Sequence, residues 1–392
     1  MTLRKISNHW RAAAGLGLAL ILAPGVTGGG AALAGDGFNF GGIFGGASDR
    51  TAYTAEIFVA STRKGGTHST ELTPGAKARF SLDYISVPPD HKPGVVELPA
   101  IGGPNPDHHF TLSQHSQLDE DEFREQIAAH VSGRVGSNRD VLIYVHGFNT
   151  SLEEARFRLA QLVVDAKFGG VAVLFTWPSK AALLAYGADK ESATASRDAY
   201  LKLLEDLSAT PGVGRIHILA HSMGTWLTME TLRESALTGS PDLHGKLGNV
   251  MLAAPDIDLT VFKNQIKRLD PSHFSVYVSK GDRALQVSAS IQGDRRLGSI
   301  DPGSEQDREM IESLGVKVFD ISDLSTGLIG HDNYADAPLA VRQIGAKMTE
   351  QRPAEASEQA VIDAGADRTP HAPPPPPGAV ISQDLPPPPA VQ

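Results

Sequence analysis

Short apolar runs alternate with longer amphipathic segments through the middle of this chain, and this alternation constrains the fold more than any other feature. The runs Val141–Val145, Val171–Thr176 and Arg215–Ala220 are largely apolar and carry β-branched residues, as expected of strands buried on both faces. The segments between them keep the 3.6-residue spacing of helices. Strands alternating with helices predict an α/β fold with a mostly parallel, doubly wound sheet and helices on both faces.

The remaining elements follow the same pattern. Helices are expected at Asp119–His130, Leu152–Lys167, Asp189–Leu207 and Gly224–Ser235, and further strands at Val250–Ala254, His273–Ser279 and Val316–Ile321. Two earlier strands, Glu56–Ala60 and Arg79–Ser86, lie among turns. We expect these two to form an antiparallel edge at the N-terminal side of the sheet.

The two ends of the chain differ from this middle part. Residues 1–34 combine a basic start, the apolar stretch Ala12–Pro24 and the triplet Ala32-Leu33-Ala34, which together predict a cleaved signal peptide. An uncleaved anchor in the inner membrane is the alternative. Residues 35–50 form a Gly-rich linker, 51–351 the folded domain, and 352–392 a Pro-rich tail expected to be disordered or to serve as a spacer or partner ligand. The mature chain is therefore expected to be periplasmic or extracellular.

Charge and cysteine content exclude several classes of function. The net charge is -10 and no basic run of five residues occurs, so a nucleic-acid partner is not expected. The chain contains no cysteine, which excludes disulfides, thiolate catalysis, Cys-ligated zinc and a lipoprotein anchor. We expect neither a metal nor an organic cofactor.

The segment Ala220-His221-Ser222-Met223-Gly224 follows a predicted strand and opens a predicted helix. This context is that of a nucleophile elbow, in which a tight turn needs small residues two positions before and after the serine. The turn would raise the Ser222 hydroxyl above the sheet and aim the Met223 N–H at a developing oxyanion. A serine at a helix start also serves simply as a cap, and the five residues alone do not exclude that.

A second loop supplies the other half of such a site. His146-Gly147-Phe148-Asn149-Thr150 follows the strand at 141–145, at the strand-to-helix loop that supplies a second oxyanion donor in folds with such an elbow. Gly147 would let the backbone approach closely, and the Phe148 N–H would be the donor. We expect His146 to hold the loop by hydrogen bonds rather than to act in catalysis.

The serine needs a base, and a base needs a carboxylate to orient it. His331 follows the last predicted strand and is the preferred base over His244, His273 and His371. Asp282 follows the strand at 273–279 and is the preferred acid. Asp256 and Asp258 follow the preceding strand and remain alternatives, although Asp258 also fits a helix cap.

The order Ser222, Asp282, His331 resembles the α/β-hydrolase superfamily, and several segments narrow the resemblance to a bacterial family of poorly characterised esterase- or lipase-like hydrolases. The segments, within residues 53–345, are Ser61-Thr62-Arg63, Ile85–Glu97, His146–Asn149, His221–Gly224, Ser279–Leu285 and Arg296-Leu297-Gly298. The resemblance implies a hydrolase fold and a Ser-Asp-His triad, but no particular substrate.

The residues together predict a serine hydrolase that cleaves a small-molecule or lipid ester through an acyl-enzyme. Alternatives are a catalytically silent binding or scaffold module of the cell envelope, and a lipase or acyltransferase that uses the same triad. A lipase would need an apolar lid, for which Ala181–Gly187 is the candidate, although that segment also fits an ordinary helix start. The sequence indicates neither substrate-binding residues nor an oligomeric state.

Overall fold

The structure is a computed structural model that describes residues 53–64, 77–180, 185–279, 282, 285, 295–322 and 333–349. The expected signal peptide, the Gly-rich linker and the Pro-rich tail lie outside these residues. Within them, no helix combines the length and apolar character needed to cross a bilayer.

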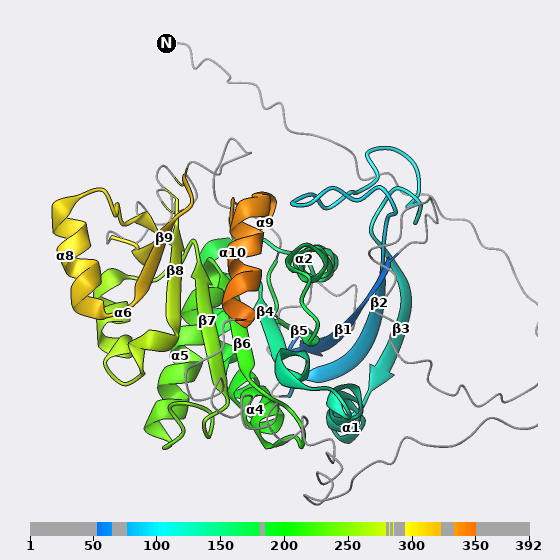
Figure 1. Ribbon diagram of the computed structural model, residues 1–392, viewed down its shortest axis with the longest axis horizontal. Coiled ribbons are helices and arrows are strands. Elements are labelled where there is room, and N and C mark those ends of the chain that lie inside the picture. Colours follow the sequence, from blue (N-terminus) through cyan, green and yellow to red (C-terminus); the bar gives the residue numbers. More distant parts are fainter. Residues whose placement is uncertain are drawn as a thin grey trace, which may run out of the picture. The chain divides into compact units, whose positions relative to one another are not determined.

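One sheet of nine strands forms the centre of the described residues (Figure 1). Its order is β3-β2-β1-β5-β4-β6-β7-β8-β9. The strands are β1 Tyr53–Ser61, β2 Arg79–Val87, β3 Thr111–Leu118, β4 Val141–Val145, β5 Val171–Thr176, β6 Ile216–His221, β7 Leu247–Ala253, β8 Phe274–Val278 and β9 Lys317–Asp320. All neighbours from β1 through β5 to β9 are parallel. The mostly parallel α/β sheet predicted from the sequence is therefore confirmed.

The antiparallel part lies at the N-terminal side, as predicted, and is larger than expected. β1 pairs antiparallel with β2 and β2 with β3, while β1 also pairs parallel with β5. The sequence did not predict β3, because Thr111–Leu118 is mostly polar and its side chains are mostly exposed. An edge strand whose side chains face water lacks the apolar signal on which such a prediction depends.

The helices cover both faces of the sheet. They are α1 Glu120–Val131, α2 Leu152–Ala166, α3 Tyr186–Ala195, α4 Arg197–Ala209, α5 Met223–Leu237, α6 Leu259–Ile266, α8 Glu305–Leu314, α9 Asn333–Asp336 and α10 Pro338–Thr349. One face packs an apolar core against α1, α4, α5 and α6. The other face packs a second core against α2, α9 and α10, and α2 and α10 lie side by side there (Figure 1).

Alternation along the central strands supplies both cores at once. In β4, Val141, Ile143 and Val145 face the first core, whereas Leu142 and Tyr144 face the second. All five are buried, which explains why this strand reads as a continuous apolar run.

The single helix predicted over Asp189–Leu207 is wrong, because α3 and α4 are separate helices that meet at Ser196. The Ser196 hydroxyl lies 2.8 Å from the Ser192 carbonyl oxygen and 2.8 Å from Thr62 Oγ1. A serine that bonds back to the preceding turn commonly bends a helix. The buried hydrogen bond between Ser196 and Thr62, which directly follows β1, holds the break between the two helices in place.

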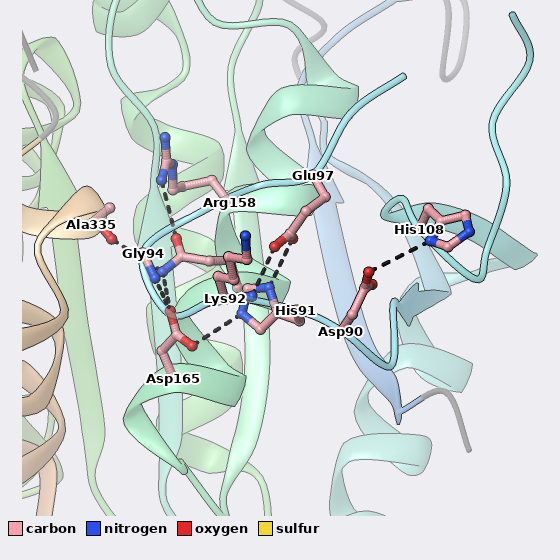
Figure 2. A network of polar contacts seen from close by, with 10 residues as sticks. Asp90, His91, Lys92, Gly94, Glu97, His108, Arg158, Asp165 and Ala335 are labelled. Atoms are coloured by element: carbon pink, nitrogen blue, oxygen red, sulfur yellow. Dashed lines mark hydrogen bonds and ion pairs between the residues drawn. The ribbon is translucent and has the colours of Figure 1, made fainter. Parts of the chain in front are cut away.

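A loop between β2 and β3 is attached to the second face by a partly buried polar cluster (Figure 2). His91 Nδ1 lies 2.8 Å from Glu97 Oε2, and His91 Nε2 lies 3.1 Å from Asp165 Oδ1 on α2. Asp165 also accepts the Gly94 N–H at 2.7 Å. A Cβ at Gly94 would come within 2.3 Å of the Asp336 carbonyl oxygen, so the loop also lies directly against α9. We call His91, Glu97 and Asp165 the His91 cluster.

Candidate active site

Ser222 lies at the carboxyl end of β6, in the turn that leads directly into α5, as expected for a nucleophile elbow. Its backbone has φ 50° and ψ -120°, a left-handed conformation that is uncommon for a residue with a side chain. Strained backbone of this kind persists only where its surroundings enforce it, and it clusters at functional sites.

The surroundings of Ser222 hold both of its backbone groups. Its N–H donates to the Ala253 carbonyl at 3.0 Å, and its carbonyl accepts the N–H of Thr225 at 3.0 Å and that of Asp256 at 3.3 Å. The Thr225 hydroxyl donates to the same carbonyl at 2.5 Å. β7, the loop after it and the first turn of α5 therefore all fix the turn.

The small residues around Ser222 are explained by close packing. A Cβ at Gly224 would lie 2.5 Å from the His146 carbonyl oxygen and 2.6 Å from that of Val145. No side chain fits there, because both neighbours are backbone atoms. Ala220, in the other small position, is fully buried in the sheet. The need for glycine is therefore strict at 224, while alanine is accommodated at 220.

The loop after β4 lies against the serine. A Cβ at Gly147 would lie 2.9 Å from both Ser222 Cβ and His221 Nδ1. In the described part of the chain, the backbone N–H groups of Phe148 and Met223 donate to no acceptor. Met223 is the first residue of α5, where N–H groups lack an intrahelical partner. Two unengaged N–H groups thus belong to the two segments that meet at Ser222.

His146 is the first residue of this loop and is fully buried. Its ring stacks on Trp177 with centroids 5.0 Å apart, and the Trp177 indole N–H donates to the His146 carbonyl at 3.0 Å. Burial, reinforced by the nearby Arg63 charge, lowers the pKa of His146 to about 3. The imidazole is therefore neutral near pH 7 and holds the loop.

Of the other two residues expected in the triad, Asp282 falls within the described residues and His331 does not. Asp282 follows β8, is buried, and accepts the Leu285 N–H on Oδ1 at 3.0 Å. His331 precedes α9, whose Tyr334 lies with its ring centroid 4.6 Å from that of His221, next to Ser222. The Tyr334 hydroxyl lies 2.8 Å from that of Tyr144 on β4.

The alternative acids have other partners. Asp256 is buried, accepts the Tyr186 hydroxyl at 2.7 Å and lies 3.3 Å from Arg296 Nε. Asp258 accepts the Val261 N–H at 2.9 Å and so caps α6, the role considered for it from the sequence.

The alternative bases lie elsewhere. His273 immediately precedes β8, and His244 precedes β7. Both therefore lie at the amino ends of parallel strands, whereas Ser222 lies at a carboxyl end. His371 lies outside the described residues.

Tyr186 and Arg296 contact the segments around Ser222, although the sequence analysis named them only within a candidate lid and a family triplet. The Tyr186 ring lies 5.4 Å from that of Phe148 and its hydroxyl donates to Asp256, so Tyr186 connects the loop after β4 to the loop after β7. Arg296 is buried against Asp256, and a Cβ at Gly298 would lie 2.8 Å from the Pro255 nitrogen. The Arg296-Leu297-Gly298 triplet was the available signal, but the partner of Arg296 is distant in sequence. Of the candidate lid, 181–184 lie outside the described residues, and Tyr186 begins α3.

Among the described residues, no group of three or more His, Asp or Glu side chains could hold a metal ion. The chemistry available at Ser222 is that of a hydroxyl at the start of a helix, next to two segments with unengaged backbone N–H groups and to the segment that carries the buried Asp256.

Comparison with solved structures returns several hydrolases at low similarity. They include a hyperthermophilic esterase from the archaeon Pyrobaculum calidifontis (14% identity, 76% of this chain and 83% of that chain, TM-score 0.38). Carboxyl esterase 2 from the mycorrhizal fungus Tuber melanosporum matches with 12% identity over 78% of this chain and 89% of that chain, with a TM-score of 0.37. A predicted CIB-like hydrolase from Thermoplasma acidophilum matches with 16% identity over 54% and 87%, with a TM-score of 0.30.

The comparison with curated proteins returns no match. The family model described as "Alpha/beta hydrolase of unknown function (DUF900)" matches residues 119–352, more than half of the chain. This match covers α1 to α10, including the elbow, the loop after β4 and the triplet at Arg296. The chain belongs to this family of α/β hydrolases.

Proposed function

We propose that this protein is an exported serine hydrolase that cleaves a carboxylic ester through an acyl-enzyme, with Ser222 as nucleophile. The observation that carries the proposal is the left-handed turn at Ser222, bordered by two segments whose Phe148 and Met223 N–H groups are unengaged within the described residues. A strained serine beside two free donors is the arrangement that acyl transfer requires.

In the proposed mechanism His331 removes the proton of the Ser222 hydroxyl as the oxygen attacks the ester carbonyl. The Phe148 and Met223 N–H groups stabilise the oxyanion that forms. His331 then protonates the leaving alcohol, and a water molecule, activated by the same imidazole, hydrolyses the acyl-enzyme.

We assign the orienting carboxylate to Asp282. Its position after β8 agrees with the chain order Ser, Asp, His that the sequence suggested. The rival Asp256 already has Arg296 and Tyr186 as partners, which supports a structural role for it. An ester is the proposed substrate, because an alcohol leaves more easily than an amine.

Labelling with a fluorescent fluorophosphonate tests the proposal, alongside hydrolysis of short-chain p-nitrophenyl esters. We expect the wild-type protein to label and turn over, and Ser222→Ala to lose both, with kcat falling by roughly a millionfold. Ser113→Ala, which changes an exposed serine on β3, is the matched control and should behave as wild type. A folded wild-type protein that neither labels nor turns over would reject the proposal and favour a binding role.

A further inference from the structure

A chain of buried hydrogen bonds runs from a cation to the loop beside Ser222. Arg63, just beyond the end of β1, donates from Nε to Thr176 Oγ1 at 3.0 Å. Thr176 Oγ1 lies 2.9 Å from His146 Nε2, and His146 Nδ1 lies 2.9 Å from the Gly147 carbonyl oxygen. Arg63, Thr176 and His146 are all at least 95% buried, at 5%, 0% and 0% exposed. We call these three residues and the Gly147–Phe148 peptide the relay.

The direction of every bond in the relay is fixed by chemistry. A carbonyl oxygen only accepts, so His146 Nδ1 must carry the proton and donate to Gly147. The neutral ring then has a lone pair on Nε2, which accepts the Thr176 hydroxyl proton. The Thr176 oxygen in turn accepts from the guanidinium. The donors therefore all point the same way, from the Arg63 charge towards Gly147.

The relay ends on the peptide group that carries one of the proposed oxyanion donors. The Gly147 carbonyl and the Phe148 N–H belong to one planar peptide, in which they point in opposite directions. A strong hydrogen bond to the carbonyl polarises the peptide and makes its N–H a better donor, and bonds in a chain strengthen one another. We propose that Arg63, Thr176 and His146 are positioning residues that aim and strengthen the Phe148 N–H for the oxyanion of the proposed ester hydrolysis.

Arg63 is well placed to be the fixed end of the relay. Its other nitrogens donate to the Ser179 carbonyl at 3.2 Å and to the Thr150 carbonyl at 3.0 Å. Arg63 is therefore hydrogen-bonded to the loops after both β4 and β5. Burial lowers the pKa of Arg63 to about 10, and Asp189 partly offsets this, so the guanidinium stays charged near neutral pH. Asp189 is linked to Arg63 through Ser179, whose carbonyl accepts from Arg63 and whose hydroxyl donates to Asp189 at 2.7 Å.

The test compares Thr176→Val, which keeps the shape of the side chain but removes the hydroxyl, with Thr176→Ser, which keeps the hydroxyl. We expect Thr176→Val to lower kcat by about tenfold with KM unchanged, less than the ~100-fold that loss of a whole oxyanion donor causes. Thr176→Ser should restore kcat to near the wild-type value. Unchanged kcat in Thr176→Val, or an effect confined to KM, would overturn the relay while leaving the proposed hydrolase intact.

Nuclear magnetic resonance tests the relay without activity. In protein labelled with ¹⁵N-phenylalanine, the Phe148 amide proton should move upfield in Thr176→Val and stay in place in Thr176→Ser. If the wild-type enzyme neither labels nor turns over, the proposed function fails and this shift still decides whether the relay exists. An amide proton that is the same in all three proteins rejects it.

A last test does not depend on Thr176→Val, should that variant fail to fold. With ¹⁵N-histidine labelling, His146 should remain the neutral Nδ1–H tautomer from pH 5 to 9, its signals assigned as those lost in His146→Gln. The Nε2–H tautomer, or titration within that range, would contradict the direction of the relay.

Discussion

Gly147 is the residue on which the geometry beside Ser222 depends most closely. A methyl group at this position would meet Ser222 Cβ and His221 Nδ1 at 2.9 Å, closer than side-chain atoms normally approach. In Gly147→Ala the loop must move away from the serine, and Phe148 moves with it. Since displacements near 1 Å cost about 100-fold in well-aligned sites, we expect kcat for ester hydrolysis to fall by roughly that factor.

The matched control for this prediction is Gly103→Ala, because a Cβ at Gly103 would meet nothing within 4 Å. Both variants add one methyl group, and both should remain folded by circular dichroism. If Gly147→Ala retained the wild-type kcat, the loop after β4 would have no part in the reaction.

At the scale of single residues, the sequence predicted short local motifs but not the contacts between residues that are distant in the chain. Ser222 and Gly147 could be proposed from the sequence because each lies in a short motif that directly follows an apolar strand. The role of Arg63 was not predicted, since its acceptors Thr176 and Ser179 lie more than 100 residues away. Sequence spacing carries no information on such contacts, so the pair Thr62-Arg63 was recognisable only as a resemblance.

The His91 cluster predicts how the attachment between the β2–β3 loop and α2 depends on pH. Burial lowers the pKa of His91, but hydrogen bonds to Asp165 and Glu97 outweigh it and raise the pKa above its usual value. A raised pKa means that the folded state binds the proton more tightly than the unfolded chain. The contribution to stability is therefore complete below ~6.5, the usual pKa of histidine, and is lost as pH rises through the folded-state pKa.

Asp165 sets the lower limit of the same window. Burial raises its pKa, but hydrogen bonds from His91, Gln161 and the Gly94 N–H outweigh burial and lower it overall. Its contribution is present above ~3.9 and is lost as pH falls through its folded-state pKa. The cluster should hold the loop most firmly between about pH 4 and 6.5.

Thermal unfolding of wild type and His91→Gln from pH 5 to 9 measures this effect. At low pH the free energy of unfolding should be larger for wild type than for His91→Gln. This difference between the two proteins should shrink as pH rises, by about 1.4 kcal/mol for each unit by which the pKa of His91 is shifted. His108→Gln is the control, because His108 is exposed in the same loop, 3.6 Å from Asp90 (Figure 2). A stability difference between His91→Gln and wild type that did not vary with pH would show that His91 acts only through packing.

At the scale of elements, strands buried on both faces were the most predictable. β4 and β5 begin and end where the apolar runs do, because every residue of both strands is buried. β3 was missed for the opposite reason, and the break between α3 and α4 was missed because Ser196 is held by Thr62 from another part of the chain. Apolar pattern reports burial, and it says little where polar contacts decide the structure.

At the scale of the whole molecule, the order of the strands could not be read from the sequence. The early strands were predicted as an antiparallel edge, yet β1 is an interior strand that pairs with both β2 and β5. A buried ion pair supports this junction, since Arg156 Nε on α2 lies 2.6 Å from Asp83 Oδ2 on β2. These neighbours are separated by long stretches of chain, and only the folded sheet brings them together.

The second core is closed by α10, the last described element, and this leads to a prediction about where the chain can be shortened. Four apolar side chains of α10 are fully or almost fully buried: Ala340, Val341, Ile344 and Met348. Gly345 packs so closely on α2 that a Cβ would lie 2.9 Å from the Ala166 carbonyl oxygen. α10 is therefore part of the core, whereas the composition of residues 352–392 predicts no packed core.

We expect a chain ending at Gln351 to unfold at the wild-type denaturant midpoint, and a chain ending at Ala337 to be unfolded or severely destabilised. Burying a side chain such as Val, Ile or Met contributes about 1.5–3 kcal/mol. Losing three of them and an alanine removes a large part of the ~5–15 kcal/mol by which domains are stable. Denaturant unfolding followed by circular dichroism measures both chains. If the chain ending at Gln351 were also destabilised, residues 352–392 would contribute to the fold, contrary to their Pro-rich composition.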